Sequence, residues 1–369
     1  MTDPTTPAGP PAEITHLVRE RTEARLRRDW PRADALKAQI EAAGWRVTDH
    51  GSRTSLGPAA PVSVSVDGEV RYGSAAAVPS LLDAPATTAW TVVVPASEEP
   101  ERLSRFLSAL RKHSPAGIQV VLVANDPSDA QAAALGAHAP DRSPIGGAVP
   151  EVLRTSARLG YTAALNIGLR RSAGEFVLLA DATAWPSGDA LGPLAAALRD
   201  PAVAVAGGFG LAAAEPGPLR PNALGRIEAA PRHGADVADA ADATALEGAW
   251  LAFRRADYVE LGPLDEHFVT PAWLDVWWTL RLRAGAEPEG AEYVEPDGES
   301  RGEGEPGATP PSDGPAAPGE IDLPAPRRAV RLELPLEREE VAWPPDRSRL
   351  NRRNMYRVLD RFGWRDDLA

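Results

Sequence analysis

The chain contains no cysteine among its 369 residues. Disulfide bonds, thiol catalysis and thiolate metal sites are therefore excluded, and the absence is compatible with a reducing compartment. No apolar run approaches the roughly 18 residues that a membrane-spanning helix needs. The first residues, MTDPTTPAGPPAE, lack the basic region and apolar core of a secretory signal, so we expect a cytoplasmic protein.

Lysine is also scarce, and acidic residues outnumber basic ones, which gives a formal net charge of −13. A protein that binds nucleic acid mainly by electrostatic attraction needs the opposite balance. The length suffices for two domains, or for one large domain with appended segments.

The first part of the chain divides by composition and pattern. Residues 1–12 are rich in proline and threonine, which is typical of disorder. Residues 13–57 predict a helical hairpin, in which Pro31 suits the first turn of the second helix and Gly44 ends it. The hairpin is followed by an extended tail from 45 to 56.

Residues 58–89 predict a short β-hairpin and a linker. Alternating valines flank the turn dipeptide Asp67-Gly68, and this dipeptide is a strong hairpin signal.

Residues 90–285 alternate unbroken apolar runs with helical patterns. This order predicts an α/β domain whose central sheet is mostly parallel and covered by helices on both faces. The expected strands cover 91–95, 118–126, 149–154, 175–181, 203–211 and 246–253, and the expected helices cover 101–113, 161–172, 191–199 and 270–285.

The last part of the chain begins with a change of composition. Residues 286–325 are rich in proline, glycine and glutamate and predict a disordered insertion. Residues 326–369 predict a strand and a basic helix that complete the domain.

The most informative stretch is LGYTAALNIGLRRSAGEFVLLADATAWP, from Leu159 to Pro186. It predicts a helix, a tight turn, a buried strand, and then Asp181 directly at the end of that strand. Ligands bind at the carboxyl ends of strands in open α/β sheets, so Asp181 is a candidate for holding a ligand or a metal ion.

Four motifs in order carry a family resemblance: TVVVPASEEPERLSRFLSAL, VVLVANDPSD, GYTAALNIGLRRSAGEFVLLAD, and EGAWLAFRRADYVELGPLDEHF followed by WLDVWWTLRLRAG. Together they resemble the family 2 glycosyltransferases, which have the GT-A nucleotide-sugar fold. The resemblance covers about 90–285 and the C-terminal piece. It implies a hexosyltransferase that moves a sugar from a nucleotide-sugar donor to an acceptor that the sequence does not identify.

The resemblance also implies where the donor binds. The loops after the first two strands hold the nucleotide base in this family, and the third motif completes the donor site. The corresponding residues here are Pro95, Ala96, Glu98, Asn125, Asp126, Asn166 and Asp181. Ala124 stands where the family usually has an aspartate that reads the base, and the alternative for Asn125 and Asp126 is a solvated turn.

A divalent cation, Mg²⁺ or Mn²⁺, normally bridges the donor diphosphate and an Asp-x-Asp pair in this family, because the leaving group needs its developing charge neutralised. Asp181 matches the first acid and would be the metal ligand, whereas Thr183 replaces the second acid. The alternative for Asp181 is a strand-end cap without a ligand. The later metal-binding histidine of many relatives is absent from RLELPLEREEVAW, where Glu339 or Glu340 would have to serve.

The family's general base is an aspartate near the start of the last helix of the domain, and Asp275 matches it. An inverting transfer needs such a carboxylate to deprotonate the acceptor hydroxyl. Glu247 and Gly248 match the acceptor-side loop, and Trp273 is a candidate platform for a sugar ring. The alternative for the neighbouring tryptophans is packing of the helix on the sheet.

The N-terminal hairpin has its own resemblance. RTEARLRRDWPRADALKAQIEAAGWRVTDHGSRTSL is similar to the small C-terminal helical module of cysteinyl-tRNA synthetase. The catalytic parts of that enzyme are absent, so no aminoacylation follows. A surplus of arginine suits contact with RNA, and the alternative is a packing or interaction module.

Three functions are therefore compared. The favoured one is nucleotide-sugar-dependent transfer. The alternative is a non-catalytic GT-A-fold binding or scaffold protein, in which the helical hairpin recruits a partner. A nucleotidyltransferase is disfavoured because PASEEPERL, after the first strand, is acidic and lacks the glycines of a phosphate-binding loop.

Overall fold

The computed structural model describes residues 10–50, 53–58, 61–96, 99–136, 143–213, 224–226, 241–286, 325–339, 349–362 and 365–368. Most of the two segments predicted to be disordered, 1–12 and 286–325, lies outside the described residues. The chain divides into two compact units, Met1–Val64 and Ser65–Ala369, and each is described by itself.

The first unit is a helical hairpin followed by a β-hairpin. It consists of α1 (Ala12–Leu26), α2 (Trp30–Ala42), β1 (Trp45–His50) and β2 (Arg53–Pro58). Asp29 caps α2 by accepting a hydrogen bond from the backbone N–H of Arg32. Ile14, Ile40 and Val47 form a small buried core. The helical hairpin is confirmed, whereas the predicted extended tail folds back on itself as two antiparallel strands.

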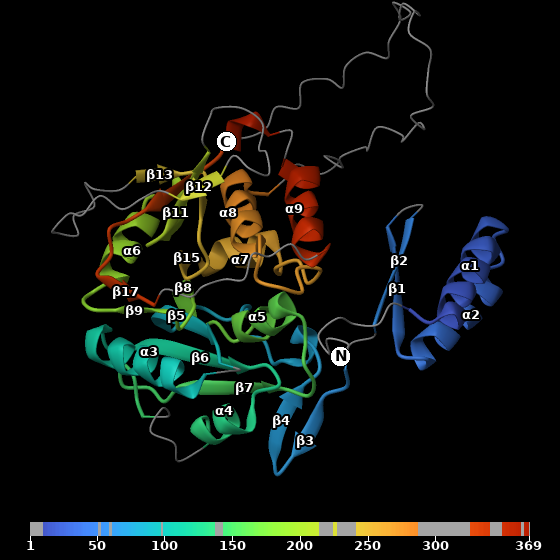
Figure 1. Cartoon of the computed structure of the whole chain (residues 1–369), viewed down its shortest axis with the longest axis horizontal. Helices are drawn as coiled ribbons and strands as arrows, with labels where there is room; N and C mark the ends of the chain where they lie inside the picture. Colours follow the sequence, from blue (N-terminus) through green and yellow to red (C-terminus); the bar gives the residue numbers. More distant parts are fainter. Residues whose placement is uncertain are drawn as a thin grey trace, which may run out of the picture. The chain divides into compact units, whose positions relative to one another are not determined.

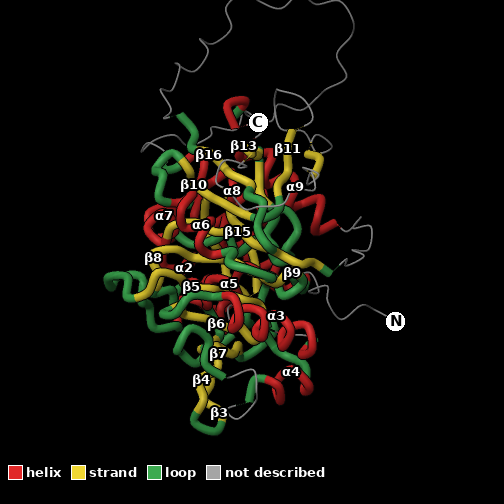
Figure 2. The backbone as a smooth tube through the Cα atoms, turned by 90° about the vertical axis from the view of Figure 1, so that its left-hand side faces the viewer, coloured by secondary structure: helices red, strands yellow, loops and turns green. Residues whose placement is uncertain are grey.

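The second unit is built on a ten-stranded sheet, whose strand labels run from β13 and β16 at the top of Figure 2 to β3 at the bottom. Their order is β13 (Ala241–Ala243), β16 (Arg328–Arg331), β10 (Val203–Gly207), β15 (Trp250–Arg254), β8 (Gly174–Ala180), β5 (Thr88–Pro95), β6 (Ile118–Ala124), β7 (Glu151–Thr155), β4 (Glu69–Tyr72) and β3 (Val64–Val66).

The central strands β8, β5, β6, β7 and β4 pair in parallel. β15 is antiparallel to both of its neighbours, β8 and β10. The α/β fold with a mostly parallel sheet is therefore confirmed. The hairpin predicted within 58–89 forms as β3 and β4, and β4 extends the sheet beyond β7.

Helices cover both faces of this sheet (Figure 1). Side chains alternate along β5, so Val92 and Val94 pack in the cluster of α3 and α6, whereas Val93 packs in the cluster of α5 and α8. Among the described helices, none combines the length and the apolar character that a bilayer crossing requires. The helices are α3 (Pro100–His113), α4 (Asp129–Ala134), α5 (Tyr161–Leu169), α6 (Leu191–Leu198), α7 (Arg255–Leu261), α8 (Leu274–Ala284) and α9 (Arg349–Phe362).

Three predicted strands are each divided in the structure. The run 203–211 splits into β10 and β11 (Gly210–Ala213), and 246–253 splits into β14 (Ala245–Leu246) and β15. The C-terminal strand splits into β16 and β17 (Leu336–Arg338). Both strands of each pair are extended, but they hydrogen-bond to different sheets, which a local pattern does not reveal. β11 pairs with β12 (Leu224–Arg226) and β14, and β17 pairs with β9 (Ala184–Pro186).

Gly168 allows α5 to approach the sheet closely. A Cβ atom at this position would lie 2.6 Å from Cγ1 of Val93 and 2.8 Å from Cγ2 of Val123. We expect Gly168→Ala to lower the free energy of unfolding by about 1–3 kcal/mol, measured by chemical denaturation, because overpacking a dense core forces side chains from their rotamers. Val93→Ala should lower the free energy of unfolding less in the Gly168→Ala variant than in the wild type, because it removes the side chain that the new methyl group contacts. Unchanged stability of Gly168→Ala would contradict the packing.

Candidate functional site

The second unit contains a cavity of about 630 Å³ at the edge where β5 and β8 end and β15 begins. This is the edge at which α/β sheets bind ligands. We call it the strand-end cavity. The sequence-predicted site residues that line it are Pro95, Asp181, Glu247, Gly248, Trp273 and Asp275.

Asp181 lies directly after β8 and is half-buried. Its Oδ1 accepts a hydrogen bond from the backbone N–H of Thr183 at 2.8 Å, and its own N–H donates to the carbonyl of Ala249 at 2.9 Å. These bonds fix the turn that follows β8 and hold the carboxylate on the cavity wall.

Asp275 lies in the first turn of α8. Its Oδ1 accepts from the N–H of Val276 at 2.9 Å, and its Oδ2 accepts from the N–H of Gly248 at 3.0 Å. A Cβ atom on residue 248 would lie 3.3 Å from Cβ of Asp275, so glycine permits this close approach. The carboxylate is thereby fixed against the loop before β15.

Burial raises the pKa of Asp275 from 3.8 to about 6. The N–H groups of Gly248 and Val276 stabilise the charged form and lower the pKa, whereas the nearby Glu247 carboxylate raises it. Desolvation is the largest of these effects. At neutral pH the group is therefore mostly ionised and still basic enough to take a proton, as a general base requires.

Three tryptophans lie close to Asp275 in the sequence. Trp273 precedes α8 with a left-handed backbone (φ +67°) and lines the cavity. Trp277 is buried, and its ring centroid lies 5.6 Å from that of Phe268. Trp278 is buried too and touches the cavity from the core side. Trp273 is thus the most accessible of the three to a ligand.

Tyr161, the first residue of α5, also lines the cavity. Burial, followed by the carboxylates of Asp181 and Asp275, raises the pKa of this phenol well above its ordinary value. The hydroxyl therefore stays protonated and able to donate. We did not predict this residue, because an isolated tyrosine at a helix start carries no sequence signal.

A second unpredicted residue, Arg338, enters the cavity wall at the end of β17. Its Nη2 lies 2.8 Å from Oε2 of Glu247, and its guanidinium stacks 4.5 Å from the ring centroid of Phe209. Glu247, the predicted acceptor-side residue, is therefore held in an ion pair.

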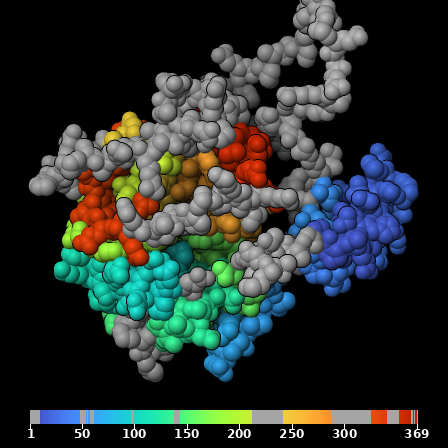
Figure 3. Space-filling view, in the orientation of Figure 1, coloured from blue at the N-terminus to red at the C-terminus, as the bar shows by residue number. Residues whose placement is uncertain are grey.

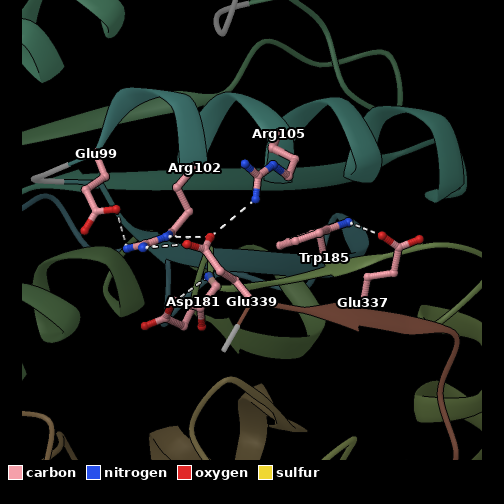
Figure 4. Close-up of polar contacts among 8 residues, drawn as sticks. Glu99, Arg102, Arg105, Asp181, Trp185, Glu337 and Glu339 are labelled. Atoms are coloured by element: carbon pink, nitrogen blue, oxygen red, sulfur yellow. Dashed lines mark hydrogen bonds and ion pairs between the residues drawn. The ribbon is translucent and has the colours of Figure 1, made fainter. Parts of the chain in front are cut away.

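Next to Arg338, Glu339 is held by two arginines of α3 (Figure 4). Both carboxylate oxygens of Glu339 accept from Arg102 at 3.2 Å, and Arg105 binds Oε2 at 3.3 Å. The hydrogen bond with Arg102 is the largest cause that lowers the pKa of Glu339 and raises that of Arg102. Glu340, the other candidate metal ligand, lies outside the described residues.

Several expected donor residues do not line the cavity. The amide of Asn125 bridges to the backbone of Leu159, donating to its carbonyl at 2.9 Å and accepting from its N–H at 2.8 Å. Asp126 adopts a left-handed backbone (φ +52°) and donates its N–H to Thr155. Ala96 is buried, and Glu98 lies outside the described residues. Asn125, Asp126 and Ala96 are not among the residues that line the strand-end cavity, and their contact with a donor stays a prediction.

Asn166 is fully buried and is not among the residues that line the cavity. Its amide nitrogen donates to the carbonyl of Leu264 and to Glu266, while its oxygen accepts from Tyr258 and from the N–H of Leu264. Both polar atoms are thus used to tie α5 to α7 and the loop that follows. Asn166 therefore has a structural role in this fold, and its contact with a donor stays a prediction.

The carboxylates at this edge fit a divalent cation poorly. Among the described residues, no three His, Cys, Asp or Glu side chains gather closely enough to hold a metal ion. Asp181 is the single acid of the expected pair, Glu247 is neutralised by Arg338, and both oxygens of Asp275 accept backbone N–H groups.

The comparisons with known proteins agree with the family resemblance. Residues 91–261 match the family described as Glycosyl transferase family 2. The match includes most of β5 and all of α3, β6, β7, α5, β8 and β15, and therefore the strands that meet at the cavity. No protein among the curated sequences matches this chain. The similarity of the first unit to the synthetase module stays a prediction.

The solved structures that are similar to this chain include the following three. The crystal structure of GalNAc-T7 with UDP, GalNAc and Mn²⁺ has 14% identity and a TM-score of 0.49, covering 74% of this chain and 48% of that one. The mannosyltransferase PcManGT from Pyrobaculum calidifontis in complex with GDP-Man and Mn²⁺ has 21% sequence identity and a TM-score of 0.38. The match covers 56% of this chain and 55% of that one. The crystal structure of S. aureus TarS 1-349 in complex with UDP has 17% sequence identity and a TM-score of 0.39. The match covers 53% of this chain and 55% of that one. The chain spans about half the length of these proteins, and the similarity is too weak to assign its ligands.

The raised pKa of Asp275 predicts a pH-dependent cost in stability. The unfolded chain releases this proton near pH 4, whereas the folded chain retains it up to about pH 6. Ionisation therefore disfavours folding as the pH rises through this window. Relative to the wild type, Asp275→Asn should gain up to about 3 kcal/mol in free energy of unfolding between pH 4 and pH 7. Urea denaturation at both pH values measures this, and a pH-independent difference would contradict the shift.

Proposed function

We propose that this chain is a glycosyltransferase that moves a sugar, with inversion, from a nucleotide-sugar donor to a hydroxyl group of an acceptor. The observation that carries the proposal is that Asp181 and Asp275, which are far apart in the sequence, line one cavity at the strand ends. The family match over residues 91–261 supports the class of reaction.

Asp275 is the general base in this proposal. The acceptor oxygen forms a bond to the anomeric carbon as the bond from that carbon to the phosphate oxygen breaks. The acceptor proton passes to the carboxylate of Asp275, and the nucleoside diphosphate leaves with the electron pair. A pKa of about 6 suits this step, because the group is ionised at neutral pH before the proton arrives.

The remaining residues of the cavity bind and orient. The Asp181 carboxylate accepts hydrogen bonds from hydroxyl groups of the donor, as carboxylates do with ribose in other nucleotide sites. Trp273 offers an aromatic face to a sugar ring. The neutral Tyr161 hydroxyl donates to an oxygen of a substrate. Contact between the first unit and RNA, like the cytoplasmic location, stays a prediction.

The donor assignment is tested by calorimetric titration with UDP and GDP. We expect one of them to bind, and Asp181→Ala to weaken that binding by about tenfold or more through the loss of charge-assisted hydrogen bonds. Asp189→Ala is the matched control. The Asp189 carboxylate also accepts a hydrogen bond from a nearby backbone N–H, that of Gly192, but Asp189 does not line the cavity. Equal effects of the two substitutions would argue against Asp181 as a donor contact.

The base assignment is tested by the release of nucleoside diphosphate during transfer. Asp275→Asn should abolish turnover and leave nucleotide affinity nearly unchanged, because the amide cannot accept the proton. In the wild type, the rate should rise about tenfold per pH unit below pH 6 and level off above it. Turnover that persists in the variant, or that is flat between pH 5 and pH 7, would refute the role of Asp275.

A further inference from the structure

The leaving group of the proposed reaction is a nucleoside diphosphate, which needs positive charge or N–H donors around its oxygens. The acids of the strand-end cavity do not gather into a metal site among the described residues. Among the described residues that line the cavity, one carries a guanidinium, and that residue is Arg338.

Arg338 reaches the cavity through a pairing between distant segments. In the antiparallel pair of β17 and β9, Arg338 lies opposite Ala184, three residues after Asp181. Arg338 and Asp181 both line the strand-end cavity. An arginine presents five N–H donors in a planar fork that matches the oxygens of a phosphate, and one nitrogen is engaged with Glu247.

The strand that carries Arg338 is held firmly in place. The N–H of Glu339 donates to the carbonyl of Thr183 at 2.8 Å, and its side chain is bound by Arg102 and Arg105 of α3. The segment that contains β17 lies on the surface beside α3 in Figure 3. The ion pair with Glu247 and the stacking on Phe209 then fix the guanidinium itself. Little side-chain entropy remains to be lost when an anion binds.

We propose that Arg338 is the cationic contact for the diphosphate of the donor, with Glu247 as the carboxylate that competes for it. This inference rests on the proposed function. The charge of Glu247 offsets part of the attraction, and Asp181 and Asp275 add negative charge to the same cavity. Removing the charge of Glu247 should therefore strengthen diphosphate binding through Arg338.

The experiment compares ligands with and without phosphates. Calorimetry measures the affinity of UDP, GDP, uridine and guanosine for the whole chain, in EDTA and in Mn²⁺. Arg338→Gln should weaken the binding of the preferred diphosphate about tenfold or more and leave its nucleoside unaffected, because only the diphosphate meets the guanidinium. Arg338→Lys keeps the charge but loses the fork and should recover part of the affinity.

Arg328→Gln is the matched control. Arg328 also pairs with a carboxylate, that of Asp242 at 2.7 Å, but it does not line the cavity. Its substitution should change neither the affinity for the diphosphate nor the affinity for the nucleoside. Glu247→Gln should strengthen diphosphate binding, and that gain should vanish when Arg338→Gln is added, because the two residues act on one another.

Each outcome decides the inference. Equal losses for diphosphate and nucleoside, or a gain from Glu247→Gln that persists without Arg338, would overturn it. Diphosphate binding that needs Mn²⁺ and ignores Arg338→Gln would also overturn it, while leaving the proposed function in place. If neither UDP nor GDP binds the wild type in EDTA or Mn²⁺, both the proposed function and the inference fail. If Arg338→Gln does not fold, the Lys variant and the gain from Glu247→Gln decide.

Discussion

The pairing of β8 with β15 is the contact on which the site depends. The two strands are antiparallel, so the first residue of β15 lies opposite the last residue of β8. The hydrogen bond from the N–H of Asp181 to the carbonyl of Ala249 continues this pairing beyond both strands. It brings the turn after β8 next to the loop of Glu247 and Gly248, and Asp275 is then bound by that loop. Two carboxylates about 90 residues apart are thereby placed in one cavity.

Asp275 lowers the stability of the folded chain at neutral pH, and Gly248 reduces that loss. A carboxylate whose pKa is raised by burial destabilises the folded chain at neutral pH, and the same shift makes it a better base. Gly248 reduces the cost by letting its N–H approach the carboxylate directly. The buried network of Asn166 supports the other side of the cavity, because it fixes the helix that begins at Tyr161.

Positive charge at this edge comes from the end of the chain. β17 adds to β9 and carries Arg338 into the wall, while α3 binds the adjacent Glu339. The segments from residue 325 onward therefore complete the site that the strands before residue 262 begin. The family match ends at residue 261, so it contains Asp181 and Glu247 but neither Asp275 nor Arg338.

The sequence by itself determined the α/β alternation, the apolar strands of the mostly parallel sheet, the helical hairpin and the positions of Asp181 and Asp275 at element ends. These features follow from local periodicity and from the turn residues beside each element. Only the tertiary structure decided that three extended runs divide between sheets and that Asn125 and Asn166 hold loops instead of lining the cavity. It also decided that Arg338 and Tyr161 reach the cavity. The physical reason is that a strand's partners and a polar side chain's hydrogen bonds come from residues far along the chain, and no local pattern records them.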